Sequence, residues 1–324
     1  MLAPLFSFCI RILEGRRAPS THWGRLPNSA LSPRRSSEAE PRTACPDVPL
    51  LKVSFLKSGL FLAEMLENLL SDTKAILSLV EEKTGCKVIL TPDEVSYLSR
   101  TLLSARHRNG EPGQIVIAYN PKAHSIDYAI AHEAVRFMRF IDAPRDKRFM
   151  LGSSEGERSI AFGTMEKDIE GLPAEAQGHI RNGFDYFYDG ILTQLVSTPG
   201  DFWINKLLLD NFPGFKPTLE EGAADIVERI HSSLSPKLER LTPKTIYKGF
   251  HAMNAAFTMF LDELMGPKDY SAPYRGSPFW EPGQALKSFN KTDRGHPGDT
   301  RTTNMWAEEL GMRKWYRWVP SITR

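Results

Sequence analysis

The chain is poor in cysteine. Its three cysteines, Cys9, Cys45 and Cys86, are far apart in a sequence of 324 residues. An odd number at these spacings indicates neither a disulfide framework nor a Cys-x-x-Cys metal-binding pair. Free thiols of this kind are typical of a reducing compartment, so we expect a cytoplasmic protein in which the cysteines have a minor structural role.

Long hydrophobic runs and an excess of one charge are also missing. No apolar run approaches the roughly 20 residues that cross a bilayer, and the segment 61–70 is interrupted by Glu64 and Glu67. Lysine and arginine total 41 against 39 acidic residues, which gives a net charge of +2. A nucleic-acid-binding protein usually carries a concentrated basic face. We therefore expect no membrane span and see no specific signal for a nucleic-acid partner.

Residues 1–55 differ in composition from the rest of the chain. They are rich in arginine, proline and serine and show no sustained hydrophobic periodicity. Such a segment buries too little apolar surface to offset the entropy lost on ordering. We interpret it as a disordered arm, a translation start placed too far upstream, or an organelle-targeting extension.

Hydrophobic periodicity becomes regular after residue 59. It predicts a helix that ends at Gly85, short strands over 87–90 and 114–119, and a helix over 126–142 that ends before Pro144. Further helices are expected at about 173–197, 201–211, 218–234, 243–265 and 303–311, with loops over 145–172 and 266–298. Asp201 is expected to cap the helix that it begins. This order predicts an α+β fold with a small β-sheet and a mostly helical C-terminal half.

The most informative motif lies on the helix predicted over 126–142. The sequence from His132 to Arg136 is His-Glu-Ala-Val-Arg, one residue different from the His-Glu-x-x-His motif that binds zinc in many metallopeptidases. Residues four apart share one face of a helix, so two histidines can hold one ion while the glutamate takes a proton from the metal-bound water. Arg136 stands where the second histidine would be. Its guanidinium stays protonated and offers no lone pair to a metal.

An ordinary amphipathic helix is the alternative interpretation. Ile126, Ile130 and Phe137 belong to one apolar stripe, while Glu133 can pair with Arg136 three residues later. Such a pair contributes a few tenths of a kcal/mol to a helix. The motif alone is therefore weak, and its sequence context carries more information.

That context resembles the IrrE/ImmA-like family of gluzincin metallopeptidases. In this family an apolar strand that ends in Asn-Pro precedes a helix of the form Ala-His-Glu-x-x-His. Here residues 115–121 read Ile-Val-Ile-Ala-Tyr-Asn-Pro, and residues 131–136 read Ala-His-Glu-Ala-Val-Arg. The chain is also similar to uncharacterised prokaryotic proteins in which this helix has drifted further from the metal motif. The resemblance covers about residues 60–200 and implies a zincin-like helical core against which the small sheet packs.

The resemblance also implies a set of candidate site residues. The family places its third metal ligand, a glutamate, on a following helix, and Asp185 falls within one position of it. A zinc site would then use His132 and Asp185, with His179 and Asp189 as alternatives, and Glu133 as the catalytic base. Residues 56–200 would form the zincin-like domain, and residues 201–324 a helical extension with a long Pro/Gly-rich loop packed on it.

Three functions follow from these observations. The sequence favours a catalytically degenerate metallopeptidase-like protein that needs no cofactor and acts by binding a protein or peptide. The first alternative is an active zinc-dependent hydrolase with non-standard ligands, and the second is a helical interaction protein unrelated to zincins. A structure without a small sheet beside the 126–142 helix would favour the second alternative. The sequence indicates no oligomeric state.

Overall fold

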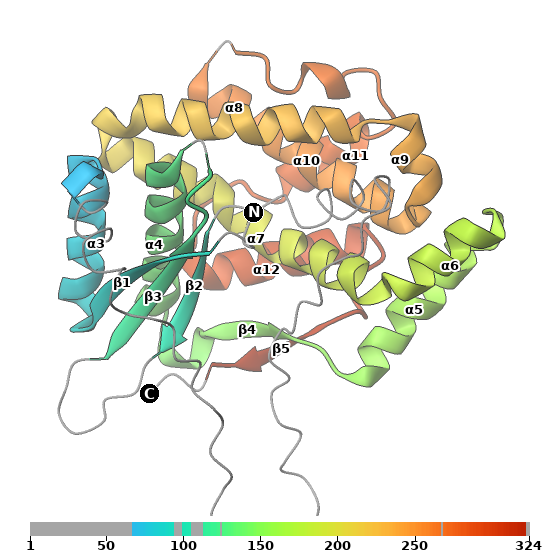
Figure 1. Cartoon of the computed structure of the whole chain (residues 1–324), viewed down its shortest axis with the longest axis horizontal. Coiled ribbons are helices and arrows are strands. Elements are labelled where there is room, and N and C mark those ends of the chain that lie inside the picture. Colours follow the sequence, from blue (N-terminus) through green and yellow to red (C-terminus); the bar gives the residue numbers. More distant parts are fainter. Residues whose placement is uncertain (1–66, 94–98, 105–112, 124, 267, 322–324) are drawn as a thin grey trace, which may run out of the picture. The chain divides into compact units, whose positions relative to one another are not determined.

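The described residues form a mostly helical α+β structure with two small sheets. The computed structural model describes residues 67–93, 99–104, 113–123, 125–266 and 268–321 (Figure 1). From Leu69 onward these residues belong to one compact unit. The predictions made for residues 1–55 lie outside the described residues. Within the described residues, no helix has the length and apolar character needed to cross a membrane.

The elements follow one another along the chain with short connections. The helices are α3 (Ser71–Thr84), α4 (Ile126–Asp142), α5 (Glu155–Ile169), α6 (Ala174–Asn182), α7 (Phe184–Asn211), α8 (Lys216–Ser233), α9 (Pro236–Leu241), α10 (Lys244–Met265), α11 (Trp280–Ser288) and α12 (Gly295–Glu309). Short 3-10 turns are η1 (Arg145–Lys147), η2 (Pro213–Phe215) and η3 (Ala272–Tyr274). The strands are β1 (Lys87–Pro92), β2 (Ser99–Ser104), β3 (Gln114–Tyr119), β4 (Phe149–Gly152) and β5 (Arg317–Pro320).

The larger sheet supports helix α4. Its order is β1-β3-β2, with β1 parallel and β2 antiparallel to the central strand β3. Ile115 and Ile117 of β3 are almost fully buried, as the apolar run of this strand predicts. After β3, the Asn120 side chain accepts a hydrogen bond from the Lys122 amide at 2.8 Å, which forms the turn that leads to α4. Helix α4 packs on β2 and β3 and also contacts α3, α7, α8 and α12 (Figure 1).

The predicted loop over 145–172 is wrong. It contains β4, which pairs with β5 near the C-terminus, and helix α5. Ser154 and Glu157 form a capping box at the start of α5. The buried residues Ala161, Met165 and Ile169 recur every four residues along it. Both signals are local, but the charged residues between them hid the helical period.

Helix α7 is continuous, and the predicted break before Asp201 is wrong. Pro199 lies inside the helix, where it removes one backbone donor. The Ser197 and Thr198 hydroxyls donate to carbonyls one turn earlier, and the Asn290 side chain donates to the Pro199 carbonyl. Because this stretch is buried on all sides, tertiary packing holds the helix together across the proline. The predicted domain boundary at residue 200 therefore falls inside one helix.

The predicted loop over 266–298 contains helix α11 and the start of α12, so this prediction is also wrong. Gly283 of α11 faces α10, where an added Cβ would lie 2.6 Å from the Ala255 Cβ and 3.1 Å from the Ala256 amide nitrogen. The two helices can approach this closely because the glycine has no side chain. Small residues at a helix crossing are therefore what orders this Gly-containing segment.

Replacing Gly283 with alanine is expected to lower the free energy of unfolding by about 1–3 kcal/mol, because the new methyl overlaps the rigid backbone of α10. Urea denaturation followed by circular dichroism measures the change. Gly163→Ala is the matched control: Gly163 lies in α5 with no atom within 4 Å of the added Cβ. It should be neutral or stabilising by up to about 1 kcal/mol. Equal effects of the two substitutions would contradict the close crossing.

Candidate functional site

The His-Glu-x-x-Arg motif lies on a face of α4 that turns toward α7. Tyr128, His132, Arg136 and Arg139 are spaced by four, four and three residues, so they share this face. His132 is 6% exposed and Glu133 is 3% exposed, which is unusual for polar residues on one helix. Buried polar groups need partners, and α7 supplies them.

The guanidinium of Arg136 joins two buried carboxylates. Its Nη2 donates to Asp201 Oδ1 at 2.5 Å, and its Nη1 lies 3.3 Å from Glu133 Oε1. The Asp201 side chain is 5% exposed and that of Arg136 is 26% exposed. Burial alone would raise the pKa of Asp201, but the adjacent guanidinium outweighs burial and lowers it. Glu133 and Asp201 are thus held by one permanent positive charge.

His132 completes this group, which we call the Arg136 cluster (His132, Glu133, Arg136 and Asp201). The His132 Nε2 lies 3.5 Å from Asp201 Oδ1. Burial lowers the pKa of His132 to about 3, because desolvation and the charge of Arg136 outweigh the attraction of Asp201. The imidazole is therefore neutral at physiological pH, and Arg136 carries the positive charge of the cluster.

A second polar contact continues the interface of α4 and α7. The Tyr128 hydroxyl donates to Asn205 Oδ1 at 3.1 Å, and Tyr128 packs 5.4 Å from the His132 ring. Burial raises the pKa of Tyr128, so it remains a neutral donor. On α8, Gly222 allows the tyrosine ring to approach, since an added Cβ would lie 2.5 Å from the Tyr128 Cδ1. The interface is closely packed on this side.

The structure does not bring the predicted ligands Asp185, Asp189 and His179 to His132. Asp185 and Asp189 both pair with Arg158 of α5, and the Asp185 side chain is 79% exposed. His179 lies 3.7 Å from Glu175 on its own helix and is 57% exposed. Asp185 and Asp189 precede Asp201 by 16 and 12 residues on α7, which corresponds to about 24 Å and 18 Å along a helix axis.

The residues around His132 do not fit a zinc site. In the part of the chain that the structure describes, no group of three or more histidine, cysteine, aspartate or glutamate side chains is placed to hold a metal. Zinc in proteins takes at least three such ligands. In the Arg136 cluster a guanidinium already neutralises the two carboxylates that an ion would meet.

The sequence predicted Asp201 as a helix cap and not as a residue of the candidate site. A usable signal was present on α7: Gln194, Thr198, Asp201 and Asn205 recur every three or four residues in an otherwise apolar helix. All four are buried. A polar stripe of this kind indicates a face that meets polar groups of other helices. Asp201 and Asn205 meet α4, and Gln194 donates to Asn254 of α10.

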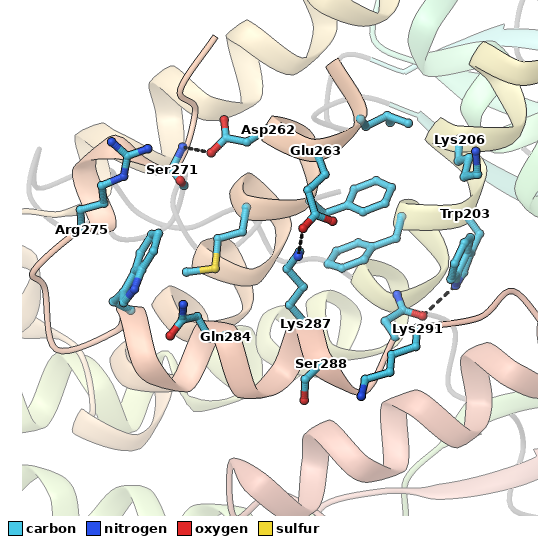
Figure 2. A pocket seen from close by; sticks show the side chains of 16 residues that line it. Trp203, Lys206, Asp262, Glu263, Ser271, Arg275, Gln284, Lys287, Ser288 and Lys291 are labelled. Carbon is cyan, nitrogen blue, oxygen red and sulfur yellow. Dashed lines mark hydrogen bonds and ion pairs between the residues drawn. The ribbon is translucent and has the colours of Figure 1, made fainter. Parts of the chain in front are cut away.

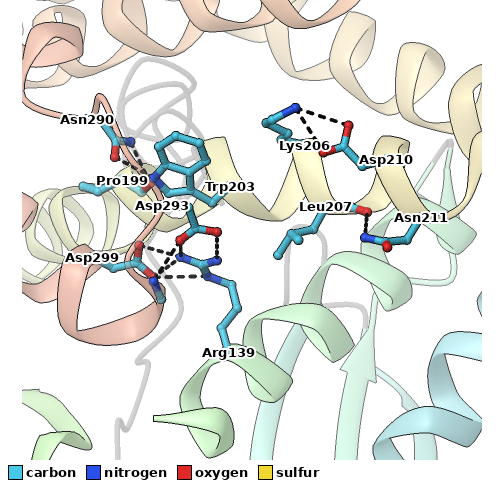
Figure 3. A network of polar contacts seen from close by, with 11 residues as sticks. Arg139, Pro199, Trp203, Lys206, Leu207, Asp210, Asn211, Asn290, Asp293 and Asp299 are labelled. Carbon is cyan, nitrogen blue, oxygen red and sulfur yellow. Dashed lines mark hydrogen bonds and ion pairs between the residues drawn. The ribbon is translucent and has the colours of Figure 1, made fainter.

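A second ion cluster attaches the C-terminal segment to α4 (Figure 3). We call it the Arg139 cluster (Arg139, Asp293 and Asp299). Arg139 donates to both oxygens of Asp293 at 2.8 and 2.9 Å and to Asp299 Oδ1 at 2.9 Å. The Arg139 side chain is 7% exposed and that of Asp299 is 14% exposed. Burial raises the pKa of Asp299 to about 6, with Asp293 and Asp201 adding to the effect against Arg139.

This raised pKa predicts that stability depends on pH. Asp299 has a folded pKa of about 6 and an unfolded pKa near 3.8. The folded state therefore binds the proton more tightly, and the protein gains stability as the pH falls from about 7 to 4. Relative to Asp299→Asn, the wild type should gain about 1–1.5 kcal/mol between about pH 7.5 and pH 5. Urea denaturation of both proteins measures it, and a difference independent of pH would contradict the assignment.

The chain matches no protein-family model, no curated protein and no solved structure. The contacts between α4 and α7 are therefore the basis for a functional inference.

Proposed function

We propose that this chain is a metallopeptidase-like protein that has lost its catalytic metal site and acts by binding a protein or peptide. The observation that carries the proposal is the pairing of Arg136 with both Glu133 and Asp201. In the resembling family, the second histidine of the motif binds the metal. In this chain the residue at that position is Arg136, whose permanent positive charge pairs with the two carboxylates instead.

Two chemical consequences support the loss of catalysis. A general base must reach a bound water, whereas the Glu133 carboxylate lies 3.3 Å from the Arg136 guanidinium. Asp201 is held by the same guanidinium, and His132 is the only histidine in the cluster. The cluster therefore lacks both a complete ligand set and a free base.

The neighbourhood of α4 supports a relation to the resembling family. Strand β3 leads through the Asn-Pro turn directly into α4, and α4 packs on β2 and β3. A helical protein unrelated to zincins was the alternative that a missing sheet would have favoured. Because the sheet is present, its absence cannot be used to favour a helical protein unrelated to zincins.

Zinc binding by an Arg136→His variant tests the proposal. The introduced histidine would complete the motif with His132, and Asp201 is within reach as a third ligand. After equilibration with zinc and removal of free metal, the wild type should retain well below one zinc per chain by elemental analysis. The variant should retain about one. Arg136→His combined with His132→Ala is the control and should lose the bound zinc again.

The opposite result would favour the alternative of an active zinc hydrolase. Stoichiometric zinc in the wild type that is lost on His132→Ala would overturn the proposal. Cleavage of fluorescent casein by the wild type, abolished by a chelator and by Glu133→Gln, would do the same.

A further inference from the structure

A pocket of the described residues lies beside α7 and is lined by the side chains that follow Asp201. Its volume is about 840 Å³, and residues of α7, α10 and α11, of the loop on either side of η3, and of the segment after α11 line it (Figure 2). Successive residues of a helix turn by about 100°, so Trp203 and Lys206 point away from the face of Asp201 and Asn205, and Phe202 lies to the side of it. We call this cavity the α7–α11 pocket.

The floor of the pocket is aromatic. Phe202 and Phe260 stack with ring centroids 4.4 Å apart and planes at 10°. Trp203 and Trp280 lie at the wall and are only half-buried, as is Phe260. Large aromatic side chains that remain partly exposed in a concave surface are typical of protein-binding sites.

The rim of the pocket carries more cations than anions. Figure 2 shows Lys206 and Lys291 near Trp203 at one end, Arg275 at the other end, and the Glu263–Lys287 ion pair between them. Asp262 also lines the pocket, but its carboxylate accepts hydrogen bonds from two backbone amides of the following loop. Four cations therefore face the cavity against two carboxylates, both of which already have partners.

The cations at the ends can take a new partner at small cost. Lys206 pairs with Asp210 and Arg275 with Asp269, and all four side chains are about half exposed. Exposed ion pairs of this kind contribute little to stability, so exchange for a carboxylate of a ligand is nearly neutral. Within the described part of the chain, Lys291 has no ion-pair partner.

Trp203 and the neighbouring rim are fixed in place by polar contacts (Figure 3). The Trp203 indole donates to Asn290 Oδ1 at 2.7 Å, and the Asn290 amide donates to the Pro199 carbonyl at 2.9 Å. Three residues later, Asp293 is held by Arg139. The wall is thus ordered before a ligand arrives, which reduces the entropy lost on binding.

We propose that the α7–α11 pocket binds an acidic peptide segment of a partner protein, with apolar side chains on the aromatic floor and carboxylates at the basic rim. Side chains of an extended segment alternate between two faces, which suits a floor and a rim of different character. This inference rests on the proposed function for the class of ligand, a protein or peptide.

Other ligand classes fit the pocket less well. A small-molecule site encloses most of its ligand, whereas the exposed side chains of Lys206, Arg275 and Lys291 form much of this rim. A nucleic acid needs a continuous basic track. Here the Glu263–Lys287 ion pair interrupts the row of cations between the two ends of the pocket, so no continuous track is present.

Fluorescence anisotropy with labelled peptides tests the proposal on the full chain. The probe is a short fluorescein-labelled peptide in which Glu and Asp alternate with Phe and Leu. One comparison peptide has lysine at the acidic positions, and another has serine at the apolar positions. We expect micromolar binding of the probe and at least about 10-fold weaker binding of both comparison peptides.

Variants locate the binding to the pocket. Lys206→Glu combined with Lys291→Glu, and separately Trp280→Ala, should each weaken binding of the probe about 10-fold or more. Lys167→Glu is the matched charge control, since Lys167 is exposed on α5 at the opposite end of α10 from the pocket. It should leave binding unchanged. Circular dichroism spectra that match the wild type show that each variant is folded.

Three outcomes would overturn the proposal: no preference for the acidic probe, an equal loss in Lys167→Glu, or tighter binding of a single-stranded oligonucleotide that displaces the probe. The zinc measurement on the same preparations is independent of these results. If the pocket does not bind the probe peptide, the proposed role of Arg136 in the loss of the metal site is unaffected. Zinc in the wild type would overturn the proposed function without changing the peptide result.

Discussion

Replacing Arg136 with leucine is expected to lower the free energy of unfolding by about 3–5 kcal/mol. The substitution leaves Glu133 and Asp201 as two like charges at a buried interface without the guanidinium that neutralises them. Because His132 is neutral, it cannot take over the positive charge. Urea denaturation followed by circular dichroism measures the loss, and the midpoint should shift without a change of slope.

A neutralised cluster is the control for this prediction. Combining Arg136→Leu with Glu133→Gln and Asp201→Asn also removes the two negative charges, and each amide keeps the size of the carboxylate that it replaces. Since buried ion pairs are often replaceable by neutral groups, this triple variant should recover much of the lost stability. A loss below about 1 kcal/mol for Arg136→Leu, or no recovery in the triple variant, would show that the cluster is not buried as described.

Replacing Arg139 with leucine is expected to have an effect of similar size, about 3–5 kcal/mol. Arg139 is the only residue of α4 that binds both Asp293 and Asp299 among the described contacts. Without it, the start of α12 and the segment before it lose their ionic attachment to α4. Hydrogen exchange should therefore increase most strongly over residues 290–300, in addition to the loss of global stability.

An exposed arginine pair is the matched control for Arg139. Arg181 pairs with Glu166 at 2.8 Å, but the two side chains are 44% and 29% exposed. Arg181→Leu should shift the midpoint of urea unfolding far less than Arg139→Leu does, because an exposed ion pair contributes little to stability. If both arginine substitutions had the same small effect, the burial of the Arg139 cluster would not contribute to stability. If exchange increased evenly over the chain, the local attachment of α12 would be wrong.

Residues close together in the sequence were enough to predict the helices and the strand around the candidate site. The predicted helix over 126–142 is confirmed, because an apolar stripe precedes Pro144 and nothing inside it breaks the helix. The predicted end of the first helix at Gly85 is confirmed as well, since Gly85 has φ of +65° and caps α3. The strand over 114–119 is also confirmed. In each case the residues that determine the element lie close to one another in the sequence.

Elements that depend on distant partners were missed. β4 pairs with β5, which lies more than 160 residues later in the chain. Helix α11 needs α10 beside Gly283. Helix α7 continues through Pro199 because this stretch is buried and the Ser197, Thr198 and Asn290 side chains donate to its carbonyls. Propensity is a weak local preference, and burial against another element overrides it.

The sequence by itself determined that Arg136 cannot be a metal ligand, because a guanidinium has no lone pair to donate, and that Glu133 lies within reach of it on one helix. Only the tertiary structure decided that Asp201 is the second carboxylate. Asp201 is 65 residues away, and the packing of α4 on α7 brings it to 2.5 Å. Helical periodicity shows which residues share a face, but it does not show which face of another helix that face will meet.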